Sequence, residues 1–294
     1  MVTRVDEQIV QHRRIAVPVP MRVWGSLFTY AALVALAAVF VLPVAWMLST
    51  GLKDLSSVAQ FPPQLIPQPA LWSNFATAVT VVPFLHYMSN SALYTAASLV
   101  GDVLSSAFVA YAFARLRCRY REPMFLLVLA TMMVPSQVQL IPQFILFKWL
   151  GWLNTYLPLI VPTYFGSPFL IFLLRQAFRS IPAELDEAAK IDGANHLTIW
   201  WRLILPLSTP ALAAVAIFSF MFHWSDFIGP LIYLNSNDLY PVSLGLQQYT
   251  AAFGGTQWNM LMAASLVAVL PCLVIFFLAQ RYLVQGIMIG GVKG

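Results

Sequence analysis

The sequence predicts an all-α integral membrane protein with six transmembrane helices. Hydrophobic residues make up 60% of the 294-residue chain and charged residues only 9%, and the mean hydropathy is +0.76. A soluble protein of this size needs more charged residues to cover its surface. Six segments also carry the roughly 20 mainly apolar residues that a membrane-spanning helix requires. Most of the exterior is therefore expected to face lipid.

These apolar segments define the expected order of elements along the chain. They are longer than the strands of a membrane β-barrel and do not alternate strictly. The predicted spans cover residues 27–48, 91–113, 124–147, 156–174, 203–224 and 260–280. They form one membrane domain at 25–284, flanked by tails at 1–24 and 285–294.

Basic residues predict which side of the membrane each loop faces. Fourteen of the 16 Lys and Arg residues fall in the N-terminal tail, after the sixth span, and in the loops after the second and fourth spans. Lys53 and Lys148 fall in the loops after the first and third spans. Because cytoplasmic loops carry an excess of Lys and Arg, we expect both termini in the cytoplasm and the loops at 53–88 and 225–258 outside it. The clusters are short and dispersed, so the net charge of +5 does not indicate a nucleic-acid partner.

The sequence shows no arrangement of residues that indicates catalysis or metal binding. The four histidines lack the spacing of metal ligands, and neither a phosphate-binding glycine loop nor a nucleophile–base pair is evident. Cys118 and Cys272 are separated by about half a bilayer in the predicted topology, so both are expected to be reduced. We expect a chain that is not an enzyme and binds no cofactor of its own.

The predicted cytoplasmic loop at 180–206 is the most informative segment. A short helix is expected to begin at Ser180 as its N-cap, to carry acidic residues in its first turn, and to end at Gly193 in a left-handed conformation. A second short helix is expected at about 195–202. Both would precede the fifth span.

The first of these helices is expected to dock into a groove of another protein. Ala188 and Ala189 form a flat surface that a partner backbone can approach closely, and Glu187 adds one charge for a cationic partner. The alternative is an amphipathic helix lying on the bilayer. The acidic first turn argues against it, because the inner leaflet is negative and repels carboxylates.

The same loop resembles the EAA signature of ABC importer permeases. That signature is Glu-Ala-Ala, three residues, Gly, nine residues, Ile, one residue and Leu-Pro. The matching residues here are Glu187, Ala188, Ala189, Gly193, Leu205 and Pro206, with Leu203 in the place of the usual Ile.

The resemblance extends over nearly the whole chain, to carbohydrate-type permeases of the maltose-transporter class. Matching segments are 90–91, 111–115, 150–155, 224–227, 230–231, 280–282 and 290–294. Ser225 stands where the family usually has Asn. The C-terminal segment resembles that of the shorter subunit of a heterodimeric permease pair.

The resemblance implies a type I ABC importer permease fold and a transport function. The chain would form half of a sugar pore with a second permease subunit, in a bacterial or archaeal cell membrane. Two ATPase subunits, which hold ATP and Mg, would dock on the EAA loop, and an extracytoplasmic binding protein would deliver the substrate. The sugar or polyol that is carried stays open.

A few polar residues in or near the spans are candidates for the substrate path. Gln137 and Gln139 follow a proline in the third span, where amides suit a hydroxyl-rich ligand, although they could equally join neighbouring helices. Asp226 follows the fifth span and is a further candidate. Asp102 lies near the middle of the second span. It either contacts a substrate or proton or, as we favour, is a buried carboxyl hydrogen-bonded to a neighbouring helix.

The sequence disfavours two other classes of protein. A secondary carrier working alone would show internal symmetry and paired ionisable residues within its spans, and only Asp102 lies centrally in one. A membrane scaffold without transport activity would not need the EAA spacing.

Overall fold

The computed structural model describes residues 19–251 and 255–291, with side chains for 26–250 and 255–281. Every regular element within these ranges is a helix, as the sequence predicts. The predicted N-terminal tail lies outside the described residues up to residue 18, as do 292–294 of the C-terminal tail. Residues 285–291, predicted as tail, continue the last helix, α16 (Trp258–Gly291).

Four segments are long and apolar enough to cross a membrane as single spans. They lie in α1 (Val19–Gly51), α4 (Phe84–Arg115), Leu157–Ser180 and α16. The segment Leu157–Ser180 comprises α7 (Leu157–Ile160), the 3-10 helix η1 (Val161–Phe165) and α8 (Pro168–Ser180). These four segments correspond to the first, second, fourth and sixth predicted spans.

The third and fifth predicted spans are bent helix pairs rather than single helices. α5 (Arg121–Thr131) and α6 (Ser136–Trp149) meet at 92°, and His196–Leu207 meets α12 (Thr209–Ser225) at 82°. The described residues therefore contain four candidate spans, or six if each bent pair counts as one. Proline accounts for both breaks, because it lacks an N–H and disfavours a helical residue before it. Pro135 stands at the first break, and Pro206 and Pro210 flank the second.

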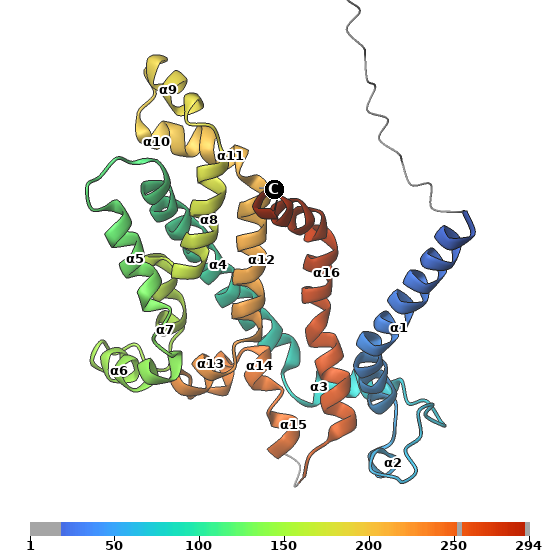
Figure 1. Cartoon of the computed structure of the whole chain (residues 1–294). Coiled ribbons are helices and arrows are strands. Elements are labelled where there is room, and N and C mark those ends of the chain that lie inside the picture. The colour runs from blue at the N-terminus through green and yellow to red at the C-terminus, as the bar shows by residue number, and fades with distance from the viewer. Residues whose placement is uncertain (1–18, 252–254, 292–294) are drawn as a thin grey trace, which may run out of the picture.

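α4 is the central helix of the bundle, with α8 and α12 packed against it, and α16 packs against α12 (Figure 1). Gly101 allows the 3-10 helix η1 to approach α4 closely. A Cβ at this position would lie 2.3 Å from Thr163 Oγ1 and 2.7 Å from the Tyr164 ring, both in η1. α1 stands apart from most of the bundle and packs mainly against the lower part of α16 (Figure 1).

The two ends of the bundle carry different short elements. Figure 1 shows α9 (Glu184–Ile191) and α10 (His196–Ile199) at the same end as the start of α1 and the end of α16. The opposite end carries α2 (Leu55–Val58), α3 (Ser73–Val81), α13 (Ile228–Tyr233), η3 (Asn237–Leu239), α14 (Val242–Gly245) and α15 (Gln248–Ala251). This arrangement groups the loops as the distribution of basic residues predicts.

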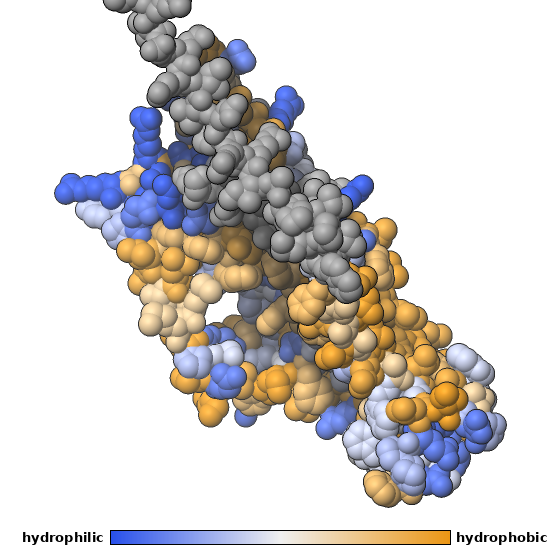
Figure 2. All heavy atoms as spheres, turned by 45° about the vertical axis from the view of Figure 1, so that its right-hand side comes forward, coloured by the Kyte–Doolittle hydropathy of each residue, from blue (hydrophilic) through white to orange (hydrophobic). Residues whose placement is uncertain are grey.

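Apolar side chains cover much of the surface between these ends. Figure 2 shows a broad hydrophobic area on one face, with hydrophilic side chains gathered toward the ends of the molecule. Many large apolar side chains of α1 and α16 are exposed, including Phe40 and Phe277. Such a surface is stable in lipid rather than in water.

Candidate functional site

The loop that carries the EAA residues begins with helix α9. Ala183 occupies the N-cap position, and no side chain caps the helix there. Ser180 is instead the last residue of α8, and its hydroxyl donates to the Ala177 carbonyl at 2.7 Å. The predicted N-cap at Ser180 is therefore wrong, because α8 runs further than the apolar pattern indicated. The acidic first turn, Glu184, Asp186 and Glu187, is confirmed and complements the positive end of the helix dipole.

Gly193 ends the helix as the sequence predicts. Its φ of +83° lies in the left-handed region, and its N–H donates to the Lys190 carbonyl at 3.0 Å. Asn195 then caps the second short helix, α10, because its Oδ1 accepts from the Thr198 N–H at 2.8 Å. The π-helical turn η2 (Trp200–Ile204) and α11 (Leu205–Leu207), which the sequence did not predict, lead on to α12.

The structure separates the six EAA residues into two groups. Glu187, Ala188, Gly193 and Pro206 are exposed. Ala189 and Leu205 are half-buried and pack against an apolar cluster that includes Phe178, Ile199 and Ile204. Ile191, at the C-terminal end of α9, is 87% exposed. The predicted flat surface is thus reduced to Ala188, and this small side chain with the Glu187 carboxylate and the exposed Ile191 has the chemistry of a protein-docking site.

A buried ion pair fixes α9 to the end of α4. Arg115 Nε lies 3.6 Å from Asp186 Oδ2, and both side chains are almost fully buried. The Arg115 guanidinium also donates to the carbonyls of Phe178 at 2.7 Å and Ile181 at 2.8 Å, at the end of α8. One side chain thus holds the ends of α4 and α8 and the start of α9 together. The sequence marks Arg115 as a basic loop residue at the end of the matching segment 111–115, but it gives no sign of this contact.

A second ion pair joins α5 to α8. Arg175 donates to Glu122 Oε1 at 2.6 Å and to Oε2 at 2.7 Å, a charge-assisted pair of bonds from one nitrogen. Its guanidinium lies 3.8 Å from the centre of the Phe125 ring, and its Nε donates to the Phe113 carbonyl at 3.2 Å. Arg115 and Arg175 together connect α9 with three helices of the bundle.

None of the three predicted substrate-path residues lines either of the two cavities described below. Gln137 is exposed, and Gln139 donates to the Val134 carbonyl at 3.3 Å, within the bend between α5 and α6. Asp226 lies just after α12 and accepts from the Gly229 N–H at 3.1 Å. Burial raises the pKa of the Asp226 carboxyl above its usual value.

Asp102 is buried and hydrogen-bonded to a neighbouring helix, as predicted. Its Oδ2 accepts from Ser219 Oγ at 2.8 Å and from His223 Nε2 at 2.9 Å, both on α12. Ser219 and His223 are four residues apart and therefore share one face of that helix. This spacing is visible in the sequence, but pairing it with Asp102 requires knowing that α4 and α12 are neighbours. Across the described part of the chain, no group of three or more His, Cys, Asp or Glu could hold a metal ion.

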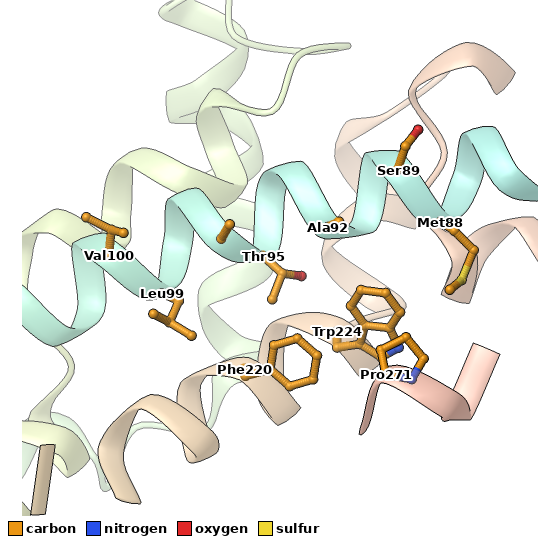
Figure 3. Close-up of a pocket in the computed structure, with 10 residues that line it drawn as sticks. Met88, Ser89, Ala92, Thr95, Leu99, Val100, Phe220, Trp224 and Pro271 are labelled. Atoms are coloured by element: carbon orange, nitrogen blue, oxygen red, sulfur yellow. The ribbon is translucent and has the colours of Figure 1, made fainter. Parts of the chain in front are cut away.

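An apolar cavity of about 630 Å³ lies between α4, α12 and α16. Met88, Thr95 and Leu99 of α4 face Phe220 and Trp224 of α12 across it (Figure 3). Thr95 Oγ1 has no hydrogen-bond partner among the described residues. The lining is otherwise almost entirely apolar, so this cavity offers little to a polar ligand.

Comparison with known proteins gives the family. Residues 103–289 match the family described as binding-protein-dependent transport system inner membrane component. The arabinooligosaccharides transport system permease protein AraQ of Halalkalibacterium halodurans is 31% identical over 273 residues, which cover 85% of this chain and 97% of AraQ. The sn-glycerol-3-phosphate transport system permease protein UgpE of Yersinia pestis is 33% identical over 242 residues, which cover 80% of this chain and 86% of UgpE.

Solved structures show the same fold. A chain of a bacterial ABC transporter that imports the acidic polysaccharide alginate superposes with a TM-score of 0.78 at 22% identity, covering 90% of this chain and 98% of that one. A chain of the alginate transporter in complex with its alginate pentasaccharide-bound periplasmic protein gives a TM-score of 0.62 at 16% identity, with 90% and 96% covered. The fold is that of a type I ABC importer permease. By its family match and its relatives, the chain belongs to the inner-membrane components of binding-protein-dependent transport systems, as a permease subunit of an ABC transporter and not an enzyme.

Proposed function

We propose that this chain forms half of the pore of an ATP-driven sugar importer and meets a cytoplasmic ATPase through α9. A second, different permease subunit supplies the other half, and an extracytoplasmic binding protein delivers the substrate. The names of the relatives support a carbohydrate or a related polyhydroxylated substrate, since AraQ serves arabinooligosaccharides. Both termini and α9 face the cytoplasm, and the chain crosses the cell membrane of a bacterium or archaeon several times.

The single observation that carries the docking proposal is the exposed surface of α9. Glu187 and Ala188 are open to a partner, while Asp186, the residue before them, is buried against Arg115. The helix therefore presents one face outward and is fixed to the bundle by the other. A helix fixed in this way moves as a rigid body with the bundle when a partner displaces it.

ATP and Mg belong to the partner ATPase in this proposal, and the chain contributes no chemistry. Closure of the two ATPase subunits would push on α9. Arg115 would pass that displacement to the ends of α4 and α8, and the Arg175–Glu122 pair would pass it to α5. Switching of the pore between its two orientations would then follow from movement of packed helices.

The test is co-purification of the ATPase with Glu187→Arg and with Gly193→Val. Glu187→Arg reverses the exposed charge without touching the buried contacts of α9, so loss of the ATPase reports on docking. Asp238→Arg is the matched control, because Asp238 is exposed at the opposite end of the molecule. The proposal expects the ATPase to be lost from both loop variants and retained by the control. Retention of the ATPase by both loop variants, with normal transport, would overturn it.

A further inference from the structure

A second cavity, of about 530 Å³, lies between α4, α12 and the η1–α8 segment. Asp102, Ser219 and His223 are among its lining residues, so the hydrogen-bonded group inside the bundle borders this space. Thr163 and Ser167 contribute further polar groups from the η1–α8 segment. The cavity thus differs from the apolar one between α4, α12 and α16.

The hydrogen bonds around Asp102 leave acceptor capacity unused. Both of its donors, Ser219 Oγ and His223 Nε2, bond to Oδ2. Among the described residues, no donor bonds to Oδ1. A carboxylate oxygen accepts about two hydrogen bonds. A hydroxyl-bearing ligand in the cavity would supply the missing donor.

Aromatic rings border the same cavity. Phe169 of α8 and Phe218 of α12 make an edge-to-face pair with their centroids 5.9 Å apart, and both line the space. Phe222 also lines it and is 68% exposed, which leaves its ring free for contact. Aromatic rings pack well against the apolar C–H faces of a sugar, while a few fixed polar groups hold its hydroxyls.

The charge of the lining residues indicates which ligands fit. Among the described side chains that line this cavity, none is Lys or Arg and Asp102 is the one acidic residue. His223, the one basic candidate, already pairs with Asp102. A phosphate or uronate group would therefore meet a carboxylate with no guanidinium or ammonium to balance it, which is unfavourable in a low-dielectric interior.

We propose that this cavity is a binding subsite for an uncharged polyhydroxylated ligand, a neutral saccharide or polyol. Asp102 and His223 bind its hydroxyl groups, and Phe169, Phe218 and Phe222 pack on its C–H faces. This inference rests on the proposed transport function and narrows its substrate class. A neutral substrate would distinguish this chain from permeases that carry anionic substrates, such as glycerol phosphates or acidic polysaccharides.

The test is substrate protection of a cysteine at the edge of the cavity. Phe222→Cys is made in a chain whose Cys118 and Cys272 are replaced by Ser, and the full complex with its partner subunits is placed in nanodiscs. The rate of N-ethylmaleimide labelling is measured with maltotriose, arabinotriose or sorbitol, and separately with sn-glycerol 3-phosphate or an alginate trisaccharide. Met221→Cys is the matched control, because Met221 is exposed on the same helix and lines neither cavity.

The expected result is that at least one neutral compound slows labelling at position 222 but not at 221, and that the anions slow neither. Adding Asp102→Asn should raise the half-protecting concentration roughly tenfold, because a neutral hydrogen bond replaces a charge-assisted one. If the complex that carries Asp102→Asn does not assemble, Ser219→Ala is the substitute variant, because it is a smaller change. Protection by none of the neutral compounds, or equal protection by the anions, would overturn the proposal.

The same samples keep this proposal separate from the docking proposal. Co-elution of the ATPase reports on α9 and does not depend on the cavity. If the complex contains the ATPase but neutral compounds do not slow labelling, the subsite proposal alone is refuted. If the ATPase does not co-elute with the unmodified chain, the docking proposal is refuted.

Discussion

Arg115 and Asp186 form a buried ion pair, 3.6 Å from Nε to Oδ2, that joins the last residue of α4 to the first turn of α9. Arg115 also holds two carbonyls at the end of α8, so the pair is one part of a larger contact. Removing one partner of a buried pair leaves the other uncompensated, which costs about 3–5 kcal/mol in comparable sites. The contact therefore belongs to the supporting structure of α9 rather than to its outer surface.

Replacing Arg115 should impair coupling more than replacing Asp186. Arg115→Met removes the ion pair and both bonds to α8, whereas Asp186→Asn keeps a polar side chain near an intact guanidinium. We expect both variants to retain some bound ATPase but to lose substrate-stimulated ATP hydrolysis, with Arg115→Met the more severe. The measurement is ATPase stimulation by loaded binding protein in proteoliposomes. Equal or greater damage from Asp186→Asn would show that Arg115 does not act through the α8 carbonyls.

The effect of each substitution at Gly193 should depend on how much free energy the new residue loses in the left-handed backbone conformation. A Cβ there would meet no atom within 4 Å, so φ of +83° is the only obstacle to a side chain. Asn tolerates this conformation, Ala loses about 1 kcal/mol, and β-branched Val loses more. ATPase retention should fall in the order Gly, Asn, Ala, Val, as measured by quantitative co-purification. An order set by side-chain volume, with Asn worse than Ala, would contradict this account.

Gly101→Ala should destabilise the bundle by forcing α4 away from η1. The new Cβ would stand 2.3 Å from Thr163 Oγ1, and overpacking of this kind costs about 1–3 kcal/mol. Thermal unfolding of the purified subunit complex should show a lower midpoint. Val100→Ala, at the adjacent and exposed position, is the control and should change the midpoint little. Unchanged stability of Gly101→Ala would mean that α4 and η1 are not in close contact.

Asp226→Asn should stabilise the protein at neutral pH. Burial raises the pKa of Asp226, so the folded state binds the proton more tightly than the unfolded state does. The favourable contribution is therefore present at acidic pH and is lost as the pH rises through the folded-state pKa. Asn stays neutral and still offers an oxygen to the Gly229 N–H. The thermal midpoint of Asp226→Asn should exceed that of the unmodified protein at pH 7, and the gain should shrink as the pH falls. A gain that grows with acidity would contradict the assignment.

Features that depend only on neighbouring residues in the chain could be predicted from the sequence. Gly193 acts within one turn, and its predicted role as helix terminator is confirmed. The second short helix also begins where it was expected, with Asn195 as its N-cap. The prolines that break the third and fifth spans are also visible in the sequence. The angle between the two helices at each break, however, depends on how those helices pack against the rest of the bundle. The predicted cap at Ser180 is wrong because the packing of α8 extends that helix past its apolar pattern.

Contacts between distant segments could not be predicted in the same way. Asp102 and His223 are 121 residues apart, and Arg115 and Asp186 are 71 apart, so each pairing depends on which helices are neighbours. Composition and spacing identified Asp102 as an unusual buried carboxyl, because burial of a charge always requires compensation. They did not identify Ser219 and His223 as the groups that compensate it.

The most direct test of the central claim is a cross-link between α9 and the ATPase. Ala188→Cys, in a chain whose Cys118 and Cys272 are replaced by Ser, is treated with a short bifunctional thiol reagent in the assembled complex. Ser236→Cys, at the opposite end of the bundle, is the control. We predict an ATP-sensitive cross-link from position 188 to the ATPase and none from 236. A cross-link from 236, with none from 188, would contradict both the docking role of α9 and the orientation of the chain.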